Sequence, residues 1–202
     1  MYNLLHLLFR TLFSLFFRWQ VSGADKIPVT GGVIIAANHI SLWDPPVIGA
    51  AITRQIHFMA KEQLFANTVF AWLISRLGAF PVRRGMADRT AIRTALSLLE
   101  DGKVLGLFPE GTRSKTGKLG RPEPGLAMLA VKAGVPVVPT AIIGTNNVFR
   151  EGKLLPKFKI IFGKPLIFTR DNKDGLADIS GKIMEEIDRL LNEEKHNRNI
   201  AG

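Results

Sequence analysis

Cysteine is absent from this chain of 202 residues. Its absence excludes disulfide bonds, thiolate metal ligands and a cysteine nucleophile, and it fits a reducing compartment. Histidine is scarce as well: four histidines leave few ways to assemble a zinc site, and we expect no metal. No "GxSxG" pattern supplies a serine nucleophile, and no run reaches the roughly 20 apolar residues that a membrane-crossing helix needs.

Acidic residues are few relative to basic ones. The 27 Lys and Arg against 17 Asp and Glu give a net charge of +10, and 47% of the residues are hydrophobic. A chain that is both basic and apolar suits an anionic membrane surface or an anionic substrate, with nucleic acid as the rival partner. One Tyr and three Trp offer little for base stacking, so we expect no nucleic-acid partner.

The first 20 residues, "MYNLLHLLFRTLFSLFFRWQ", form the most apolar segment. Its apolar part is roughly 14 residues or about 21 Å long as a helix, which is too short to cross the hydrocarbon core. At about 100° per residue, the polar residues fall within about 140° of one face; they are Asn3, His6, Arg10, Thr11, Ser14 and Arg18. A narrow cationic stripe beside a wide Leu and Phe face is typical of a helix lying in the membrane interface.

We therefore predict a membrane-interface helical segment over residues 1–20 and an α/β domain over residues 21–202. The expected membrane-facing residues are Leu4, Leu5, Leu8, Leu12, Leu15 and Phe16, with Arg10 and Arg18 among anionic headgroups. The alternative is a helix that docks on the protein's own core. A signal peptide is disfavoured, because the first residues carry no Lys or Arg and because His6 and Arg10 interrupt the apolar run.

Strands and helices are expected to alternate over the rest of the chain. Apolar runs predict strands at residues 33–37, 56–60, 103–108, 135–143 and 158–163. Apolar residues at helical spacing, with Pro or Gly at the ends, predict helices at residues 45–52, 67–78, 87–101 and 124–134, and a last helix through residues 179–190. This alternation predicts an α/β fold with a mostly parallel, mixed sheet flanked by helices.

The segment "NHISLWD", residues 38–44, places an imidazole and a carboxylate just after the first core strand. In such sheets, ligands gather beyond the carboxyl ends of the strands. If the turn loops back, Asp44 can bond one nitrogen of His39 and leave the other free to accept a proton, as in a Ser-His-Asp triad. Without a protein nucleophile, this dyad suggests that the substrate brings its own, such as a hydroxyl. The alternative is a strand-end histidine satisfied by a helix-capping Asp.

Two further segments carry polar groups suited to an anionic ligand. In "FPEGTRS", Gly111 permits close approach of the backbone, Thr112 can donate a hydrogen bond, and Arg113 can fork onto a phosphate. The spacing of this loop does not fit a P-loop, because Leu119 stands where Ser or Thr should hold magnesium. In "GAFPVRRG", Arg83 and Arg84 would point to opposite sides of an extended chain.

Together, "NHISLWD", "GAFPVRRG", "FPEGTRS" and "VPVVPTAI" resemble, in order and spacing, the four blocks of the 1-acyl-sn-glycerol-3-phosphate acyltransferase (lysophosphatidic acid acyltransferase) family. The blocks span residues 38 to about 142 of this chain. The second block departs from the family pattern, with Pro81 in place of a large apolar residue and Arg83 where an acid is common.

The resemblance implies transfer of a fatty acyl group from acyl-CoA or acyl carrier protein to the sn-2 hydroxyl of lysophosphatidic acid, without a cofactor. It implies that His39 is the general base and Asp44 its partner, and that Arg84, Arg113 and Lys61 hold the acceptor phosphate. Glu110 is expected to order its loop or to bind a glycerol hydroxyl. The implied location is the cytoplasmic face of the cell membrane, as a peripheral or monotopic protein. Which of Arg83 and Arg84 contacts phosphate stays open.

Three rival interpretations remain. The first is a protein without catalytic activity that binds anionic lipid or nucleic acid. The second is a thioesterase, which would use water in place of the lipid hydroxyl. The third is a member of the same family with another acceptor, such as glycerol 3-phosphate or another lysophospholipid.

Overall fold

The structure, a computed structural model, describes residues 2–83, 88–148, 157–169 and 174–200. In these residues, seven strands form one sheet in the order β1-β7-β6-β2-β5-β3-β4, and every neighbouring pair is parallel except β6 and β7. The strands are β1 (Gln20–Ser22), β2 (Val33–Ala37), β3 (Ile56–Lys61), β4 (Ala79–Val82), β5 (Val104–Leu107), β6 (Val137–Ile143) and β7 (Lys159–Phe162). The helices are α1 (Tyr2–Phe16), α2 (Asp44–Ala51), α3 (Thr68–Arg76), α4 (Arg89–Glu100), α5 (Gly125–Ala133) and α6 (Leu176–Ile200), with short 3-10 turns η1 (Ala24–Lys26), η2 (Glu62–Phe65) and η3 (Thr145–Asn147).

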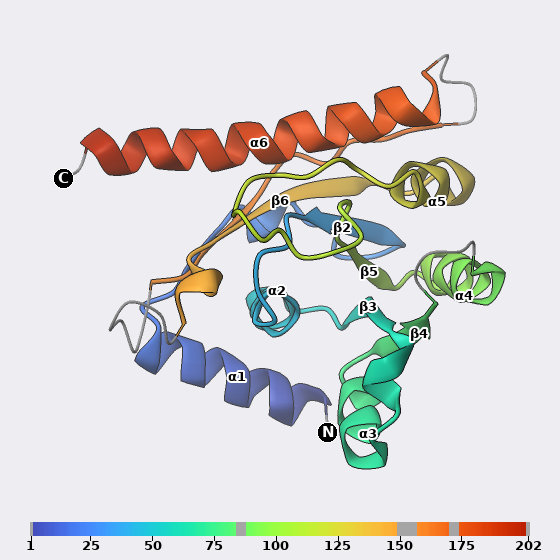
Figure 1. Ribbon diagram of the computed structural model, residues 1–202, viewed down its shortest axis with the longest axis horizontal. Helices are drawn as coiled ribbons and strands as arrows, with labels where there is room; N and C mark the ends of the chain where they lie inside the picture. Colours follow the sequence, from blue (N-terminus) through green and yellow to red (C-terminus); the bar gives the residue numbers. More distant parts are fainter. Residues whose placement is uncertain (1, 84–87, 149–156, 170–173, 201–202) are drawn as a thin grey trace.

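Helices cover both faces of the sheet (Figure 1). Side chains alternate across a strand, and β2 shows this directly. Its Val33, Ile35 and Ala37 pack into a cluster with α1 and α2. Its Ile34 and Ala36 pack into a second cluster with α4, α5 and α6. All five residues of β2 are buried, as expected of a central strand with both faces covered.

The predicted α/β class with a mostly parallel, mixed sheet is confirmed, and each predicted strand and helix is present. Their ends differ from the prediction by a few residues, except that the last helix, predicted to residue 190, continues to Ile200. Two short edge strands, β1 and β4, were not predicted. β4 contains Pro81, which lacks the N–H that a central strand needs but is tolerated at an edge. β1 has three residues, too few to show a periodicity.

The N-terminal helix α1 docks on the core through its phenylalanines. Phe13 has no exposed surface, and its ring centroid lies 5.8 Å from that of Phe158 and 6.3 Å from that of Trp43. Phe17 stacks on Phe158 with the ring centroids 4.6 Å apart. A ring nitrogen of His6 lies 2.8 Å from the backbone oxygen of Ile52 near the end of α2. For this face, the core-docking alternative is the one that the structure adopts.

The outer face of α1 remains apolar and exposed. Of the residues expected to face a membrane, Leu4, Leu8, Leu15 and Phe16 are exposed, whereas Leu5 is half-buried and Leu12 packs against the core. Leu7 adds to the exposed set. Among the described residues, no helix combines the length and the hydrophobicity needed to cross a membrane. The helix therefore joins the core by one face and leaves a row of leucines uncovered on the other.

We predict that the two faces of α1 respond differently to substitution. Phe13→Ala should lower the free energy of unfolding by about 3–5 kcal/mol, because it opens a cavity in a packed core. Leu8→Ser, at an exposed position of the same helix, should change it by no more than about 0.5 kcal/mol. Urea unfolding followed by circular dichroism measures both, and equal midpoints for the two variants would contradict the docked arrangement.

Candidate active site

The strand order brings the predicted site residues to one edge of the sheet. β2, β3, β4, β5 and β6 all point the same way, so their carboxyl ends meet at this edge. His39 follows β2, Glu110 follows β5, and Lys61 ends β3. Ligands of open parallel sheets bind at this edge, so the position agrees with the sequence-based expectation.

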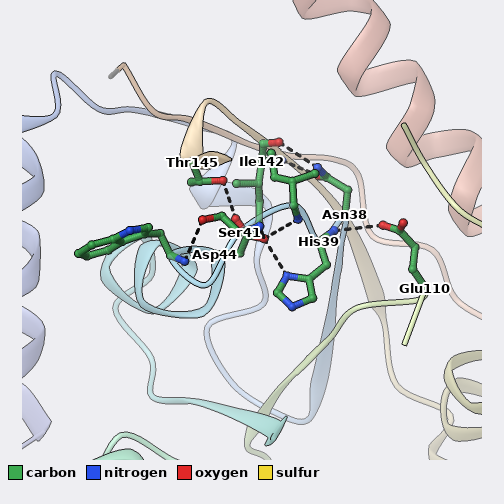
Figure 2. Close-up of polar contacts among 9 residues, drawn as sticks. Asn38, His39, Ser41, Asp44, Glu110, Ile142 and Thr145 are labelled. Carbon is green, nitrogen blue, oxygen red and sulfur yellow. Dashed lines mark hydrogen bonds and ion pairs between the residues drawn. The ribbon is translucent and has the colours of Figure 1, made fainter. Parts of the chain in front are cut away.

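His39 and Asp44 form the predicted dyad (Figure 2). Nδ1 of His39 lies 2.7 Å from Oδ2 of Asp44, and both residues are buried. The same Oδ2 accepts hydrogen bonds from the backbone amides of Ile40 at 2.7 Å and Ser41 at 2.8 Å. Because Oδ2 already accepts two amide hydrogens, it acts as an acceptor toward the ring as well. Nδ1 therefore carries the hydrogen and donates a hydrogen bond to Asp44. Nε2 is left with a free lone pair.

Thr145 completes the environment of Asp44. Its hydroxyl donates a 2.6 Å hydrogen bond to Oδ1 of Asp44, so both carboxylate oxygens are engaged. Asp44 is also the first residue of α2, where the positive end of the helix dipole favours a negative charge. Sequence reasoning missed Thr145, because it lies 101 positions from Asp44 and no spacing rule connects the two residues.

His39 is also fixed by ring stacking and by hydrogen bonds of its backbone. The ring of Phe108 stacks on that of His39, with the centroids 3.9 Å apart and the planes 15° from parallel. Oε1 of Glu110 accepts the backbone N–H of His39 at 3.1 Å, and Oε2 accepts that of Gly120 at 2.9 Å. The N–H of Ser114 donates to the carbonyl of His39 at 2.8 Å. These contacts are those that a loop-ordering role for Glu110 requires.

Asn38 fixes the end of β2 against β6. Its side-chain amide donates to the carbonyl of Ile142 at 2.9 Å, and its Oδ1 accepts the N–H of Ile142 at 2.7 Å. With these two bonds, the Asn38 side chain takes the place of a backbone peptide group in pairing with Ile142 of β6. Since η3 follows β6 directly, the pair also sets the position of Thr145 relative to Asp44.

In the part of the chain that the structure describes, His57, the histidine within β3, lacks the carboxylate partner that His39 has. His57 on β3 is half-buried, and its burial lowers the pKa of its imidazole below the usual value. Among the described histidines, His39 alone pairs with a carboxylate. No hydrogen bond joins Nε2 of His39 to a hydroxyl of the described residues. The lone pair of Nε2 is therefore not taken up by such a hydrogen bond within the described residues.

A pocket of about 300 Å³ opens beside Glu110. It is lined by the predicted residues Thr112 and Arg113, and also by Lys118 and Arg121, which sequence reasoning did not select. Gly111 has a φ of 64°, in the left-handed region that glycine adopts readily, and a Cβ there would lie 3.1 Å from Cγ of Glu123. The only available signal for Lys118 and Arg121 was the basic character of the loop, which is equally typical of a solvated loop.

Lys61 and Arg83 lie outside this pocket. Lys61 is exposed at the end of β3, in register with Val82 of β4. Arg83 is exposed and pairs with Glu62 through Nε, at 3.1 Å from Oε1. Arg84 lies outside the described residues. Within the described part of the chain, no three His, Asp or Glu side chains gather as metal ligands would.

Comparison with known proteins fits this arrangement. The family described as Acyltransferase matches residues 18–143. The chain belongs to the acyltransferase family.

Three proteins of this kind are similar to the chain. The 1-acyl-sn-glycerol-3-phosphate acyltransferase of Bacillus subtilis is 32% identical over 182 residues, which cover 86% of this chain and 88% of that protein. The lyso-ornithine lipid O-acyltransferase of Pseudomonas aeruginosa is 34% identical over 128 residues, which cover 62% of this chain and 47% of that protein. The crystal structure of the 1-acyl-sn-glycerophosphate (LPA) acyltransferase PlsC from Thermotoga maritima superposes with a TM-score of 0.81 at 29% identity, covering 96% of this chain and 79% of that one.

The acyltransferase match includes the dyad and the loop with Arg113, and it ends just before Thr145. It begins at residue 18, after the end of α1 at Phe16, so the whole of that helix lies outside the matched region. The match also ends before β7 and α6, whereas the similar PlsC structure covers 96% of this chain.

We predict that His39→Ala lowers acyl transfer by about 10²–10⁴-fold, because it removes the group that accepts the proton. Asp44→Asn should lower the rate as well, since an amide no longer fixes the tautomer that leaves Nε2 free. Single-turnover rates with a thioester donor measure both effects, and circular dichroism checks the fold. Wild-type turnover in His39→Ala would rule out this dyad as the catalytic base.

We predict that Thr145→Val has a smaller effect on the rate than the two dyad substitutions. It keeps the volume but removes the hydrogen bond to Oδ1, so its rate should fall less than that of His39→Ala while the KM of either substrate stays unchanged. Thr145→Ser, which keeps the hydroxyl, is its matched control.

Proposed function

We propose that the protein is a 1-acyl-sn-glycerol-3-phosphate acyltransferase. It transfers a fatty acyl group from a thioester, acyl-CoA or acyl carrier protein, to the sn-2 hydroxyl of lysophosphatidic acid, and the product is phosphatidic acid. The observation that carries this proposal is the buried His39–Asp44 pair, whose free Nε2 lies at the same sheet edge as a pocket lined by cations.

In this mechanism, Nε2 of His39 takes the proton of the acceptor hydroxyl as its oxygen attacks the thioester carbonyl. Asp44 stabilises the imidazolium that forms, since its carboxylate already accepts the Nδ1 proton at 2.7 Å. The tetrahedral intermediate collapses with cleavage of the C–S bond, and the imidazolium returns its proton to the leaving thiolate. The products are an ester and a free thiol, and His39 is neutral again.

Among the described residues, Arg113 is better placed than Lys61 to bind the phosphate. It lines the pocket beside Glu110, and its planar guanidinium can donate two parallel hydrogen bonds to a phosphate. Lys118 and Arg121 add positive charge to the same pocket. Holding the phosphate there converts binding into orientation of the hydroxyl at Nε2. Lys61 and Arg84 are the remaining candidates, from the neighbouring strands.

The outer face of α1 supports a location at the membrane. Its exposed leucines would enter the acyl-chain region, and Arg10 and Arg18 would lie among anionic headgroups, each adding about 1 kcal/mol of attraction. We place the protein on the cytoplasmic face of the cell membrane, as a peripheral or monotopic enzyme. There, the site would meet an acceptor that resides in the bilayer.

A second candidate function keeps the reaction and changes the acceptor. The similarity to a lyso-ornithine lipid O-acyltransferase favours it. An ornithine headgroup carries an amine and one carboxylate but no phosphate, so a pocket lined by Arg113, Lys118 and Arg121 suits it less well than it suits a dianionic phosphate monoester.

We predict that the purified protein forms phosphatidic acid from lysophosphatidic acid and an acyl thioester. The acceptor panel should also contain glycerol 3-phosphate, a lysophospholipid with a choline headgroup, lyso-ornithine lipid and a sample without acceptor. The kcat/KM for lysophosphatidic acid should be the highest, because this acceptor joins a dianionic phosphate to an acyl chain. Faster thioester cleavage without acceptor would favour the thioesterase, and a higher value for lyso-ornithine lipid would favour the second candidate.

We predict that Arg113→Ala raises the KM for lysophosphatidic acid by about 10- to 100-fold, since a hydrogen bond to a charged group contributes about 1.5–3 kcal/mol. The KM for the thioester should change far less. Arg113→Lys should rescue only part of the loss, because an ammonium lacks the planar fork. Lys118→Ala and Arg121→Ala should each raise the acceptor KM by a smaller factor.

Lys164→Ala is the matched control for these cation variants. Lys164 is exposed and follows β7, which is antiparallel to β6, so it lies at the opposite edge of the sheet. An unchanged acceptor KM in the Arg113, Lys118 and Arg121 variants would place the phosphate at Lys61 and Arg84 instead.

A further inference from the structure

Helix α3 leaves large apolar side chains uncovered. None of its nine residues is buried, although its sequence is "TVFAWLISR". Val69 is 77% exposed and Trp72 53% exposed, and Phe70 and, in the preceding η2 turn, Leu64 are also exposed. We call these four residues the α3 patch. Several large apolar side chains exposed on one helix and the turn before it indicate an interaction site.

The patch is built on a preformed helix. The side chain of Asn67 accepts the N–H of Phe70 at 3.0 Å and thereby caps the N-terminus of α3. Val69, Trp72 and Arg76 are spaced i, i+3 and i+7, so they share one helical face. The guanidinium carbon of Arg76 lies 5.8 Å from the centroid of the Trp72 ring. This face therefore presents an aromatic and a β-branched side chain together with a cation.

The topology places α3 on the same side of the sheet as α1. The connection from β2 through α2 to β3 and the connection from β3 through α3 to β4 step in the same direction along the sheet. Because such parallel crossovers are right-handed, α2 and α3 cover the same face, and Figure 1 shows α1, α2 and α3 below the sheet. The η2 turn that leads into α3 starts directly after Lys61, at the edge that carries the dyad.

We propose that the α3 patch is a second membrane contact, separate from α1, which inserts Trp72 and Val69 into the interface of an anionic bilayer. Trp is suited to this depth, with its ring among the upper acyl chains and its N–H among polar headgroups. Arg76 beside it would meet lipid phosphates. The net charge of +10 and the exposed leucines of α1 on the same side of the sheet favour a lipid surface over a protein partner.

The inference rests on the proposed function only for the choice of a lipid bilayer as the partner. Binding to vesicles needs neither substrate nor catalysis, so it is measured separately from acyl transfer. If the proposed function were wrong, no variant would transfer acyl groups, whereas the vesicle measurements would still decide on the patch.

Trp72 itself is the reporter. The chain has three tryptophans, so Trp19→Phe with Trp43→Phe leaves Trp72 as the only one. Circular dichroism establishes that this background is folded. Added to vesicles of phosphatidylglycerol and phosphatidylcholine, the protein should show a blue-shifted Trp72 emission, and brominated acyl chains should quench it. A protein that binds the vesicles while its Trp72 emission is neither shifted nor quenched would overturn the proposal.

Substitution of the patch gives a second, independent readout. Val69→Ser combined with Trp72→Ser in the full-length chain should weaken partition into the same vesicles by about tenfold or more. Ile167→Ser is the matched control: Ile167 is 64% exposed, but its neighbours Leu166 and Phe168 belong to the core cluster under α6, on the other side of the sheet. Partition should be unchanged in the control.

Equal partition of the wild-type protein, the patch variant and the control would contradict the proposal. So would a Trp72 signal that responds to acyl carrier protein in solution and not to vesicles, since it would assign the patch to a protein partner. With a short-chain lysophosphatidic acid present as monomers, the patch variant should keep wild-type kcat/KM, because α3 contributes no residue to the dyad or to the cation-lined pocket.

Discussion

Asp44 carries a carboxylate with no exposed surface, and four hydrogen-bond donors hold it: the ring of His39, the amides of Ile40 and Ser41, and the hydroxyl of Thr145. A buried charge is tolerated only when such partners are in place. Three of the donors come from the turn after β2 and the fourth from the turn after β6. The dyad therefore exists only when the β2 turn, the start of α2 and the end of β6 are all assembled.

The same carboxylate connects the site to the packing below it. Asn38 locks β2 to β6 just before the turn, so the donors on the two strands keep their relative positions. Trp43 precedes Asp44 and packs its ring against those of Phe13 in α1 and Phe17 directly after it. The apolar helix thus supports the residue next to the carboxylate of the dyad. An element predicted as a membrane contact is also part of the support of the site.

The sequence was most informative where a local pattern decides the structure. The buried run before "NHISLWD" and the spacing of His39 and Asp44 predicted a strand end with a dyad, because a turn of this length can return the carboxylate to the ring. Thr145 and the exposed groups of the cationic pocket, Lys118 and Arg121, were beyond such reasoning. Their positions depend on which strands pair, and that is a property of the whole sheet. For α1, periodicity gave an apolar surface but could not divide it between Phe13, which is buried, and Leu8, which is exposed.

The division of α1 into a docked and an uncovered face bears on how the enzyme would meet its acceptor. A helix held by Phe13 and Phe17 cannot move far from the sheet without exposing the core, so its outer leucines have a fixed position relative to the dyad. A membrane that takes up these leucines would therefore also fix the distance from His39 to the bilayer. α3 buries no residue, and only its short connections to β3 and β4 limit its position. Two contacts on one side of a sheet would determine the tilt of the protein on the surface as well as its depth, whereas one contact would leave the tilt free. Since the acceptor hydroxyl lies at the level of the headgroups, control of this tilt is what would bring the buried imidazole to it.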